Sequence, residues 1–486
     1  MSKEIEFKLQ IPLHMHAQLQ QDFAALTSDC QHLRAQYFDT DDLKLHKHGI
    51  ALRLRLENDI WIQTLKLHCK QSFKRLEQQE TLGRKAPKHC VLTPYQDHTK
   101  VSKLLKVALG SLKTPLSLQF ETEVQRSIYL AHYKNSVIEI AFDQGKIQCN
   151  QQSIMIDELE FELKQGQLSE LIEYIQPWVQ RYELWLDSRS KSDRGYALVT
   201  GNNMIPVQHQ RPLQLSKQDT LHRMLQKIIG NTLQQLLPNA TALSTEHYES
   251  EHVHQARVTI RRLRSALRFL NVAELEIPFI WAEQLTELFQ QLGATRDRDA
   301  LAESLLPQLA AIGSPLLTLP PITQDMIQVS SLFQAPKTNH LILDLLHYSQ
   351  AEPKTMSTDI HVLYKRLSKL HQQICADAEL FSELDIEDQH RTRKRVKRLR
   401  YNIEFLQSLF PAQQRKEYLK ILKPLQASLG QYNDLHVAEN LYQDYVTQEP
   451  KAWFVLGWLM AEQQHLKQTI QAELKAFAHI KPFWKS

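Results

Sequence analysis

The sequence is poor in the residues that build the common phosphate-binding loops. It has only 12 glycines among 486 residues, and neither G-x-x-x-x-G-K-[ST] nor G-x-G-x-x-G occurs in it. The glycine-rich backbone cradles that hold nucleotides in many enzymes are therefore excluded. Any site for a phosphate must be built from side chains.

Cysteine pairs and long apolar runs are also missing. The five cysteines (Cys30, Cys69, Cys90, Cys149 and Cys375) form no C-x-x-C pair, which argues against a zinc site and a disulfide framework. No apolar run approaches the ~20 residues of a membrane span, and MSKEIEF lacks the apolar core of a signal peptide. We therefore expect a cytoplasmic protein with reduced thiols and no membrane partner.

The length predicts more than one domain, because single cores tend to split beyond roughly 250 to 300 residues. Hydrophobic residues make up 42% of the chain and charged residues 23%, with a formal net charge of +4. A net charge this small says little about partners. The positions of the charged residues along the chain are more informative about partners than the net charge.

The two halves of the chain differ in hydrophobic period. Up to about residue 200, apolar and charged residues alternate, which predicts antiparallel strands; residues 14–26 and 171–180 have helical spacing instead. From about residue 217 the spacing is helical almost throughout, after the connector GNNMIPVQHQRPLQLS. We predict domains at 1–202 and 217–486, joined by a linker at 203–216. The alternating runs are EIEFKLQI, IALRLRL, WIQTLKLH, VIEIAF and DELEFELK.

The second half contains an internal repeat. HQARVTIRRLRSALRFL (254–270) aligns with HRTRKRVKRLRYNIEFL (390–406), and LGATRDRDALAE (292–303) aligns with LGQYNDLHVAEN (429–440). Two matches in the same order indicate a duplicated helical unit, about 217–350 and 351–486. We expect two four-helix bundles.

Like charges share one face of the predicted strands, because residues two apart point the same way. Each such face, taken alone, is more typical of a solvated surface. The opposite faces are strongly apolar, however, as in Leu52 and Leu54. If the apolar faces pack outward against helices, the charged faces line the lumen of a barrel. Such a lumen would offer carboxylates to a hard cation, Mg²⁺ or Mn²⁺, and Arg and Lys to phosphate oxygens.

The first of these runs, Glu4-Ile5-Glu6-Phe7-Lys8, resembles the E-x-E-x-K signature of the CYTH superfamily, the triphosphate tunnel metalloenzymes. The second half resembles the CHAD domain through its HxxR-containing repeated helices and its LGxxRDxD-like segment. This order of domains is similar to that of bacterial inorganic triphosphatases. Further CYTH-like motifs follow in order: YFDTDDLKLHKHGIALRLR (37–55), QTLK (63–66), RLE (75–77), IEIAFDQGKI (138–147), ELEFELKQG (158–166) and SKSDRGYAL (190–198).

The resemblance implies an α+β chain with two different parts. An N-terminal eight-stranded antiparallel β-tunnel with flanking helices would hydrolyse inorganic triphosphate, and an all-α, duplicated four-helix-bundle domain would follow. By matching positions, catalysis would depend on Glu4, Glu6 and Lys8. The metal would be held by Glu4, Glu6, Glu158, Glu160 and Glu162. The phosphates would be held by Lys8, Arg53, Arg55, Lys66, Arg75, Arg126, Lys191 and Arg194.

Basic residues recur at matching positions of the two repeated helices, three or four residues apart and hence on one face. A basic helix is often only a solvated face, but the recurrence favours an anion-binding surface. The helices lack interleaved aromatics for base stacking, which disfavours nucleic acid; the CHAD resemblance implies polyphosphate as the partner. The residues concerned are His254, Arg257, Arg261, Arg264, His390, Arg393, Lys397 and Arg400.

Two alternatives remain beside inorganic triphosphate hydrolysis. The same tunnel could act on thiamine triphosphate or cyclise ATP as a class IV adenylate cyclase does, although no adenine or thiazole pocket is evident in the sequence. The protein could also be a non-catalytic polyphosphate-binding scaffold with an idle tunnel. The retained acidic and basic residues argue against an idle tunnel.

Overall fold

The computed structural model describes residues 2–26, 29–68, 73–87, 89–95, 99–111, 113–271, 275–321, 328–352 and 360–485. Side chains are described throughout these ranges except at residues 2–3, 68, 74–75, 99–100, 294–300 and 485. The side chains of Arg75 and of all four residues of the RDRD segment (296–299) therefore lie outside the described part.

One antiparallel sheet of nine strands forms the N-terminal region, with the order β5-β4-β3-β2-β6-β7-β8-β1-β9. Strands β7 and β8 extend beyond the runs VIEIAF and DELEFELK that the alternation marked, and no alternating run was predicted over β6. The strands are β1 (Ser2–Gln10), β2 (Asp29–Asp39), β3 (Ile50–Glu57), β4 (Ile60–His68), β5 (Lys74–Gly83), β6 (Ser117–Tyr133), β7 (Ser136–Cys149), β8 (Gln152–Gln165) and β9 (Trp185–Leu186).

Strand β1 connects the two ends of this order. It pairs with β8 through residues 6–10 and, through residues 2–5, with β5 at the far end of the sheet. The predicted eight strands are thus joined to one another, and the two-residue β9 adds to β1 at Leu9 and Gln10. The strands surround a cavity to which all of β1 to β8 contribute side chains.

On β1, β3, β4 and β8 the apolar residues turn outward and the charged residues turn into this cavity, whereas β2 turns Leu33, Ala35 and Tyr37 into it. On β3 and β4, Leu52 and Leu65 are buried in one cluster with Val101 and Leu105 of α3. On β8, Phe161 meets the ring of Trp178 on α4 at a centroid distance of 5.6 Å. The arrangement expected from the alternation is confirmed.

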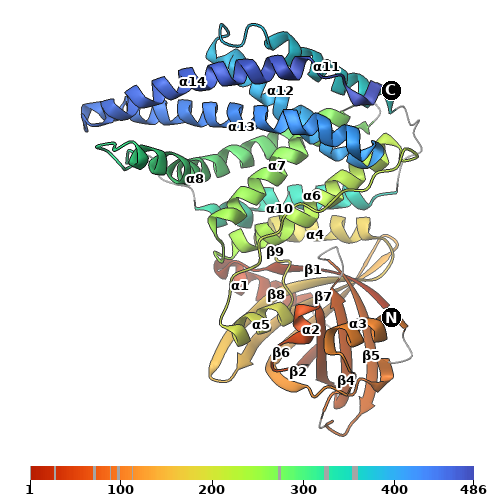
Figure 1. The fold of residues 1–486 in the computed structure, drawn as a ribbon. Helices are drawn as coiled ribbons and strands as arrows, with labels where there is room; N and C mark the ends of the chain where they lie inside the picture. Colours follow the sequence, from red (N-terminus) through yellow and green to blue (C-terminus); the bar gives the residue numbers. More distant parts are fainter. Residues whose placement is uncertain are drawn as a thin grey trace. The chain divides into compact units, whose positions relative to one another are not determined.

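The C-terminal region is entirely helical in its described part, as expected, and the α+β class is confirmed (Figure 1). Helices α13 and α14 lie side by side. The helices that flank the sheet are α1 (His16–Leu26), α2 (Lys44–Lys47), α3 (Thr99–Leu109), α4 (Leu168–Tyr182) and α5 (Lys191–Thr200). Those that follow are α6 (Leu221–Ser244), α7 (Ser250–Leu270), α8 (Phe279–Ala311), α9 (Val329–Gln334), α10 (Pro336–Gln350), α11 (His361–Asp377), α12 (Ile386–Phe405), α13 (Ala412–Gln443) and α14 (Ala452–Ala478).

The chain forms two compact units. Unit 1 comprises Met1–His209, Leu233–Ala256 and Gln328–Ala351, and unit 2 comprises Gln210–Thr232, Arg257–Ile327 and Glu352–Ser486. Unit 1 thus includes α9, α10 and parts of α6 and α7 together with the sheet. The domain limits at 202 and 217 stay a prediction.

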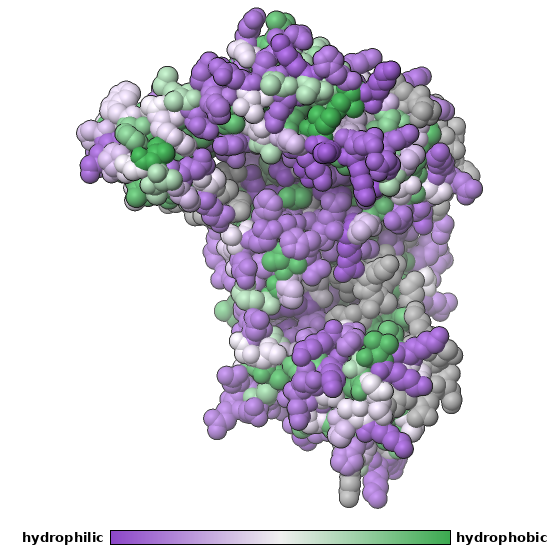
Figure 2. Space-filling model, viewed as in Figure 1, coloured by the Kyte–Doolittle hydropathy of each residue, from purple (hydrophilic) through white to green (hydrophobic). Residues whose placement is uncertain are grey.

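Hydrophilic side chains cover most of the face drawn in Figure 2, with apolar side chains in small groups. Among the described helices, none has both the length and the apolar character needed to cross a membrane.

Candidate active site

The cavity inside the sheet has a volume of about 360 Å³ and is lined mainly by charged side chains. Ligand pockets typically measure about 300–1,000 Å³ but are mostly apolar. A charged lumen of this size is suited to a small, highly charged ligand.

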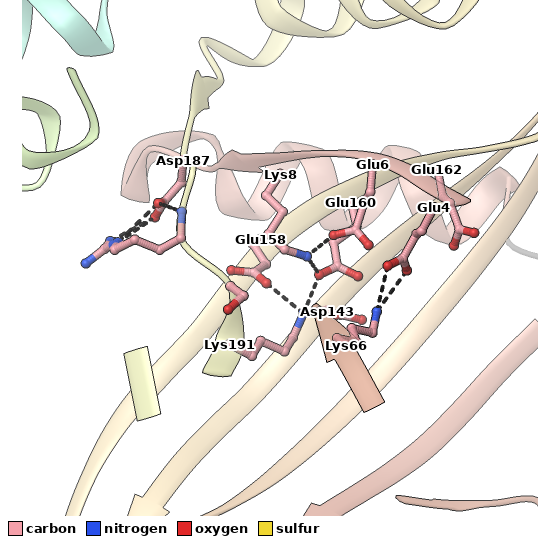
Figure 3. A network of polar contacts seen from close by, with 12 residues as sticks. Glu4, Glu6, Lys8, Lys66, Asp143, Glu158, Glu160, Glu162, Asp187 and Lys191 are labelled. Carbon is pink, nitrogen blue, oxygen red and sulfur yellow. Dashed lines mark hydrogen bonds and ion pairs between the residues drawn. The ribbon is translucent and has the colours of Figure 1, made fainter. Parts of the chain in front are cut away.

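Strand register decides which charges meet. The antiparallel pairing of β1 with β8 sets Glu6 opposite Glu162 and Lys8 opposite Glu160. The pairing of β7 with β8 sets Asp143 opposite Glu158. Opposite residues lie within about 5.5 Å in such ladders. The carboxylates form two groups, which Lys8 connects through its ion pairs with Glu6 and Glu160 (Figure 3).

The first group consists of Glu4, Glu6 and Glu162, whose nearest carboxylate oxygens all lie within 4.8 Å of one another. Lys66 Nζ donates to both carboxylate oxygens of Glu4 at 2.9 Å, and Lys66 lowers the pKa of Glu4 although burial opposes this. Burial raises the pKa of Glu162, with a smaller contribution from Glu4 and Glu6, despite Lys164. Each of these carboxylates has a lysine partner, Lys66, Lys8 or Lys164, and three close carboxylates are a donor set that a hard divalent cation prefers.

The second group consists of Asp143, Glu158 and Glu160, all buried. Lys191 Nζ lies 2.5 Å, 2.6 Å and 2.7 Å from oxygens of these three carboxylates, and Arg126 bonds to Asp143 and Glu160. Burial alone would raise the pKa of Glu160, but Lys191 and the other cations hold it well below its usual value. The cations already neutralise this group, which makes it a weaker candidate for a metal.

Two arginines on β3 face the cavity, and each has one donor without a partner in the described part of the chain. The Nε atoms of Arg53 and Arg55 are buried and have no hydrogen-bond partner among the described residues. Burial and the like charge of Arg53 lower the pKa of Arg55 to about 10, although Glu57 opposes this. Buried donors without partners are rare in folded proteins. They indicate that an anionic ligand completes the site.

The structure brings most of the predicted site residues together. Glu158 and Arg194 form an ion pair at 2.9 Å beside the second group, and the side chain of Arg75 is outside the described part. The residues that line the cavity directly are Glu4, Glu6, Lys8, Arg53, Arg55, Lys66, Arg126, Glu160, Glu162 and Lys191.

Sequence reasoning missed several side chains of the cavity. Asp143 is the clearest, since it completes the second carboxylate group. The alternation in VIEIAFD could have found it, because Glu139 and Asp143 share a face of β7 while Ile138 and Ile140 are fully buried on the other. The others are Tyr37, Glu77, Glu139 and Lys164.

The basic repeat places a second group of cations in unit 2. Lys397 is surrounded by Arg393 of its own helix and by Arg257 and Arg261 of α7; Asp434 of α13 is the nearby acid. Burial and these cations lower the pKa of Lys397 to about 7. Because basic side chains outnumber acidic ones around Lys397, this group is suited to bind a polyanion.

The remaining residues of the basic repeat have other contacts. Arg264 lies over the ring of Phe289 at 5.3 Å, and Arg400 Nε donates to Glu404 at 2.8 Å. His254 stands one turn before Arg257 on α7, and the pKa of His390 is lowered by burial and by Arg393.

Comparisons with known proteins agree with this division. Residues 2–196 match the family model of the CYTH domain, and residues 227–443 match that of the CHAD domain. An inorganic triphosphatase of Haemophilus influenzae is 31% identical over 204 residues, which are 41% of this chain and 55% of that protein. The chain therefore spans about half the length of this curated relative.

Two solved structures are similar in part. The CHAD domain from the plant Ricinus communis matches at 28% identity and a TM-score of 0.48, over 57% of this chain and 97% of that one. A putative adenylyl cyclase from Hippeastrum matches at 14% identity and a TM-score of 0.29, over 41% of this chain and 97% of that one.

Proposed function

We propose that this chain, a CYTH domain followed by a CHAD domain, hydrolyses inorganic triphosphate to diphosphate and phosphate in the cavity of unit 1. The observation that carries the proposal is the cavity itself, where Arg53 and Arg55 have unpartnered buried donors and a carboxylate group lies across from them. The curated relative with an inorganic triphosphatase name supports the substrate.

The residues present fit a divalent cation, Mg²⁺ or Mn²⁺. Glu4, Glu6 and Glu162 would hold it, since their oxygens are close together and hard oxygen donors suit both ions. When bound, such a cation neutralises phosphate charge and makes a coordinated water more acidic.

The chain's own cations would bind and orient the phosphates. Phosphoryl transfer depends mostly on positioning and charge neutralisation. Arg53 and Arg55 supply donors that can bind phosphate oxygens, whereas Arg126 is already paired with Asp143 and Glu160. A water oxygen forms a bond to the terminal phosphorus, the bond from that phosphorus to the bridging oxygen breaks, and diphosphate leaves with the electron pair.

Phosphate release from the full chain tests this function. We expect inorganic triphosphate to be hydrolysed much faster than ATP or thiamine triphosphate, and only with Mg²⁺ or Mn²⁺. Thiamine triphosphate or ATP as the better substrate would contradict the proposal, as would equal rates without metal.

A carboxylate variant tests the site. We expect Glu6→Gln to lower metal-saturated kcat at least about 100-fold while the thermal midpoint stays close to the wild-type value. Glu123→Gln is the matched control, because Glu123 is on β6 and its side chain is 42% exposed beside His32 and Lys146. An unimpaired Glu6→Gln rate would overturn the assignment.

The helical part would bind long polyphosphate without chemistry of its own. The observation that supports this is the set of cations around Lys397. We expect the double variant Arg261→Gln/Lys397→Gln to bind polyphosphate at least about tenfold more weakly at moderate salt, since each charge-assisted hydrogen bond contributes roughly 1.5–3 kcal/mol. Lys475→Gln, at a half-exposed lysine on α14, is the control; equal losses in both proteins would contradict the site.

A further inference from the structure

A short segment of unit 1, residues 185–190, connects β9 to α5. It is called the strap here. It begins with β9 (Trp185–Leu186) and ends at Ser190, the N-cap of α5. The first residue of α5 is Lys191, which binds the second carboxylate group. The strap therefore leads directly into the candidate active site.

The strap also contacts the site at its middle. The backbone N–H of Asp187 donates to the carbonyl oxygen of Lys8 at 3.0 Å, and Lys8 lines the cavity. At its end, Ser190 and Asp193 form a reciprocal capping box that fixes the start of α5. The strap thus contacts Lys8 at its middle and adjoins Lys191 at its end (Figure 3).

Two buried side chains from later helices hold this segment within unit 1. Leu186 N–H donates to Asn339 Oδ1 of α10 at 2.9 Å. Ser188 N–H donates to Thr241 Oγ1 of α6 at 3.0 Å, and the two hydroxyl oxygens lie 2.9 Å apart. Asn339 and Thr241 are each only 1% exposed.

The backbone amides of residues 186–188 are therefore bonded in turn to α10, to the carbonyl of Lys8 and to α6. Buried amides need partners in any fold, so a merely structural role is the alternative. These bonds differ from other buried amide bonds because the strap contacts Lys8 and leads into Lys191, which are two cations of the candidate active site. Small displacements of groups that orient a reactant can lower rates by about 100-fold.

We propose that Thr241 and Asn339 are positioning residues for triphosphate hydrolysis: by holding the strap, Thr241 keeps Lys191 in place and Asn339 keeps Lys8 in place. This inference rests on the proposed function. Both residues lie within the CHAD match and the strap lies within the CYTH match. Hydrolysis accordingly depends on side chains far beyond the β-strand region in sequence.

The test uses the full chain and inorganic triphosphate. We expect Thr241→Val, which keeps the shape but removes the hydroxyl, to lower kcat about tenfold and to change KM less than twofold. Thr241→Ser restores the hydroxyl and should recover at least half of the wild-type kcat. Asp344→Ala is the control: it removes the bond from Gln176 of α4 to α10 at 2.7 Å without touching the strap, and its kcat should stay within twofold.

The same substitution in a protein that already carries Lys191→Met distinguishes a positioning role of Thr241 from a loss of stability. If Thr241 acts through Lys191, Thr241→Val should lower kcat less than twofold in a protein that already carries Lys191→Met. A full tenfold loss there, or equal losses in Asp344→Ala and Thr241→Val, would overturn the proposal. Should Thr241→Val not fold, Ser188→Ala removes only the hydroxyl contact and should lower kcat two- to threefold; an unchanged kcat then overturns the proposal.

Amide hydrogen exchange tests the positioning role of Thr241 separately from the proposed hydrolysis of triphosphate. If the wild-type protein hydrolyses no triphosphate, the proposed function fails. Thr241→Val should still speed exchange at Ser188 and in the first turn of α5, and Asp344→Ala should not. Unchanged exchange in Thr241→Val would overturn the positioning role by itself.

Discussion

Tyr37 on β2 is a single side chain whose pKa depends on the charged residues of the cavity. It is only 3% exposed and lines the cavity beside Arg53. Burial would raise the pKa of its phenol, but Arg53, Lys191 and Lys66 together lower that pKa. In turn, burial opposes the charge of Arg53, while Tyr37 and Glu77 raise the pKa of Arg53. The phenol therefore orients one of the predicted phosphate ligands.

We expect Tyr37→Phe to lower kcat/KM for triphosphate about tenfold or more, because hydrogen bonds to charged groups contribute roughly 1.5–3 kcal/mol. Steady-state kinetics would measure the change. Tyr182→Phe is the matched control, since its hydroxyl donates to Asp22 at 2.9 Å and does not line the cavity. Equal losses in the two variants would show that Tyr37 only stabilises the fold.

Lys397 makes a pH dependence of anion binding testable. Its pKa of about 7 in the free protein should rise when a polyanion binds, so binding takes up a proton above pH 7. Polyphosphate affinity should then be constant below about pH 6.5 and should fall by up to about tenfold per pH unit from pH 7 to 9. Lys397→Arg keeps its charge and should remove most of this slope. The same slope in both proteins, measured by titration calorimetry, would contradict the assignment.

At the scale of the elements, Gly195 allows helix α5 to pack closely against the sheet. A Cβ added at Gly195 would lie 2.1 Å from the ring of Phe120 on β6. The helix can approach β6 this closely only because residue 195 has no side chain. Its N-terminal turn, fixed by the capping box, carries Lys191 and Arg194 toward the carboxylates.

We expect Gly195→Ala to destabilise unit 1 by about 1–3 kcal/mol, the usual cost of overpacking a core. It should also lower kcat, because α5 must move away from β6 and carry Lys191 with it. Gly430→Ala on α13 is the control, because a Cβ there meets nothing within 4 Å; it should raise helix stability by up to about 1 kcal/mol. Thermal unfolding followed by kinetics would test both, and an unchanged thermal midpoint in Gly195→Ala would contradict the close packing.

At the scale of the whole molecule, the residues proposed for triphosphate hydrolysis and those proposed for polyphosphate binding form separate groups. The cavity of unit 1 combines carboxylates with cations. The surroundings of Lys397 in unit 2 are mainly cationic, with Asp434 as the one acid among the groups that act on its pKa. We therefore expect hydrolysis in the cavity to need a divalent cation and polyphosphate binding not to need one.

Chelation should separate the two activities in the same preparation. We expect excess EDTA to abolish triphosphate hydrolysis and to leave polyphosphate affinity within about twofold, because basic side chains need no metal to bind phosphate. Restoring Mg²⁺ should restore hydrolysis. Loss of polyphosphate binding on chelation would show that a metal also serves the helical part.

The alternating pattern was sufficient to predict much of the fold and part of the site. Period two sets Leu52 and Arg53 on opposite faces of β3 whatever the strand pairs with, and the apolar outer faces required helices to cover them. The same rule applied to VIEIAFD would have identified Asp143. Tyr37 could not be found this way, because its lowered pKa depends on Arg53, Lys66 and Lys191, which come from three other elements.

The sequence by itself determined the alternating strands, the helical repeat and the common face of Glu4, Glu6 and Lys8, because side-chain periodicity is a local property of the backbone. Only the tertiary structure decided that Glu162 joins Glu4 and Glu6 whereas Glu158 and Glu160 join Asp143. That choice depends on strand register, which is set between strands more than 100 residues apart. The strap's bonds to Thr241 and Asn339 likewise exist only where distant segments fold together.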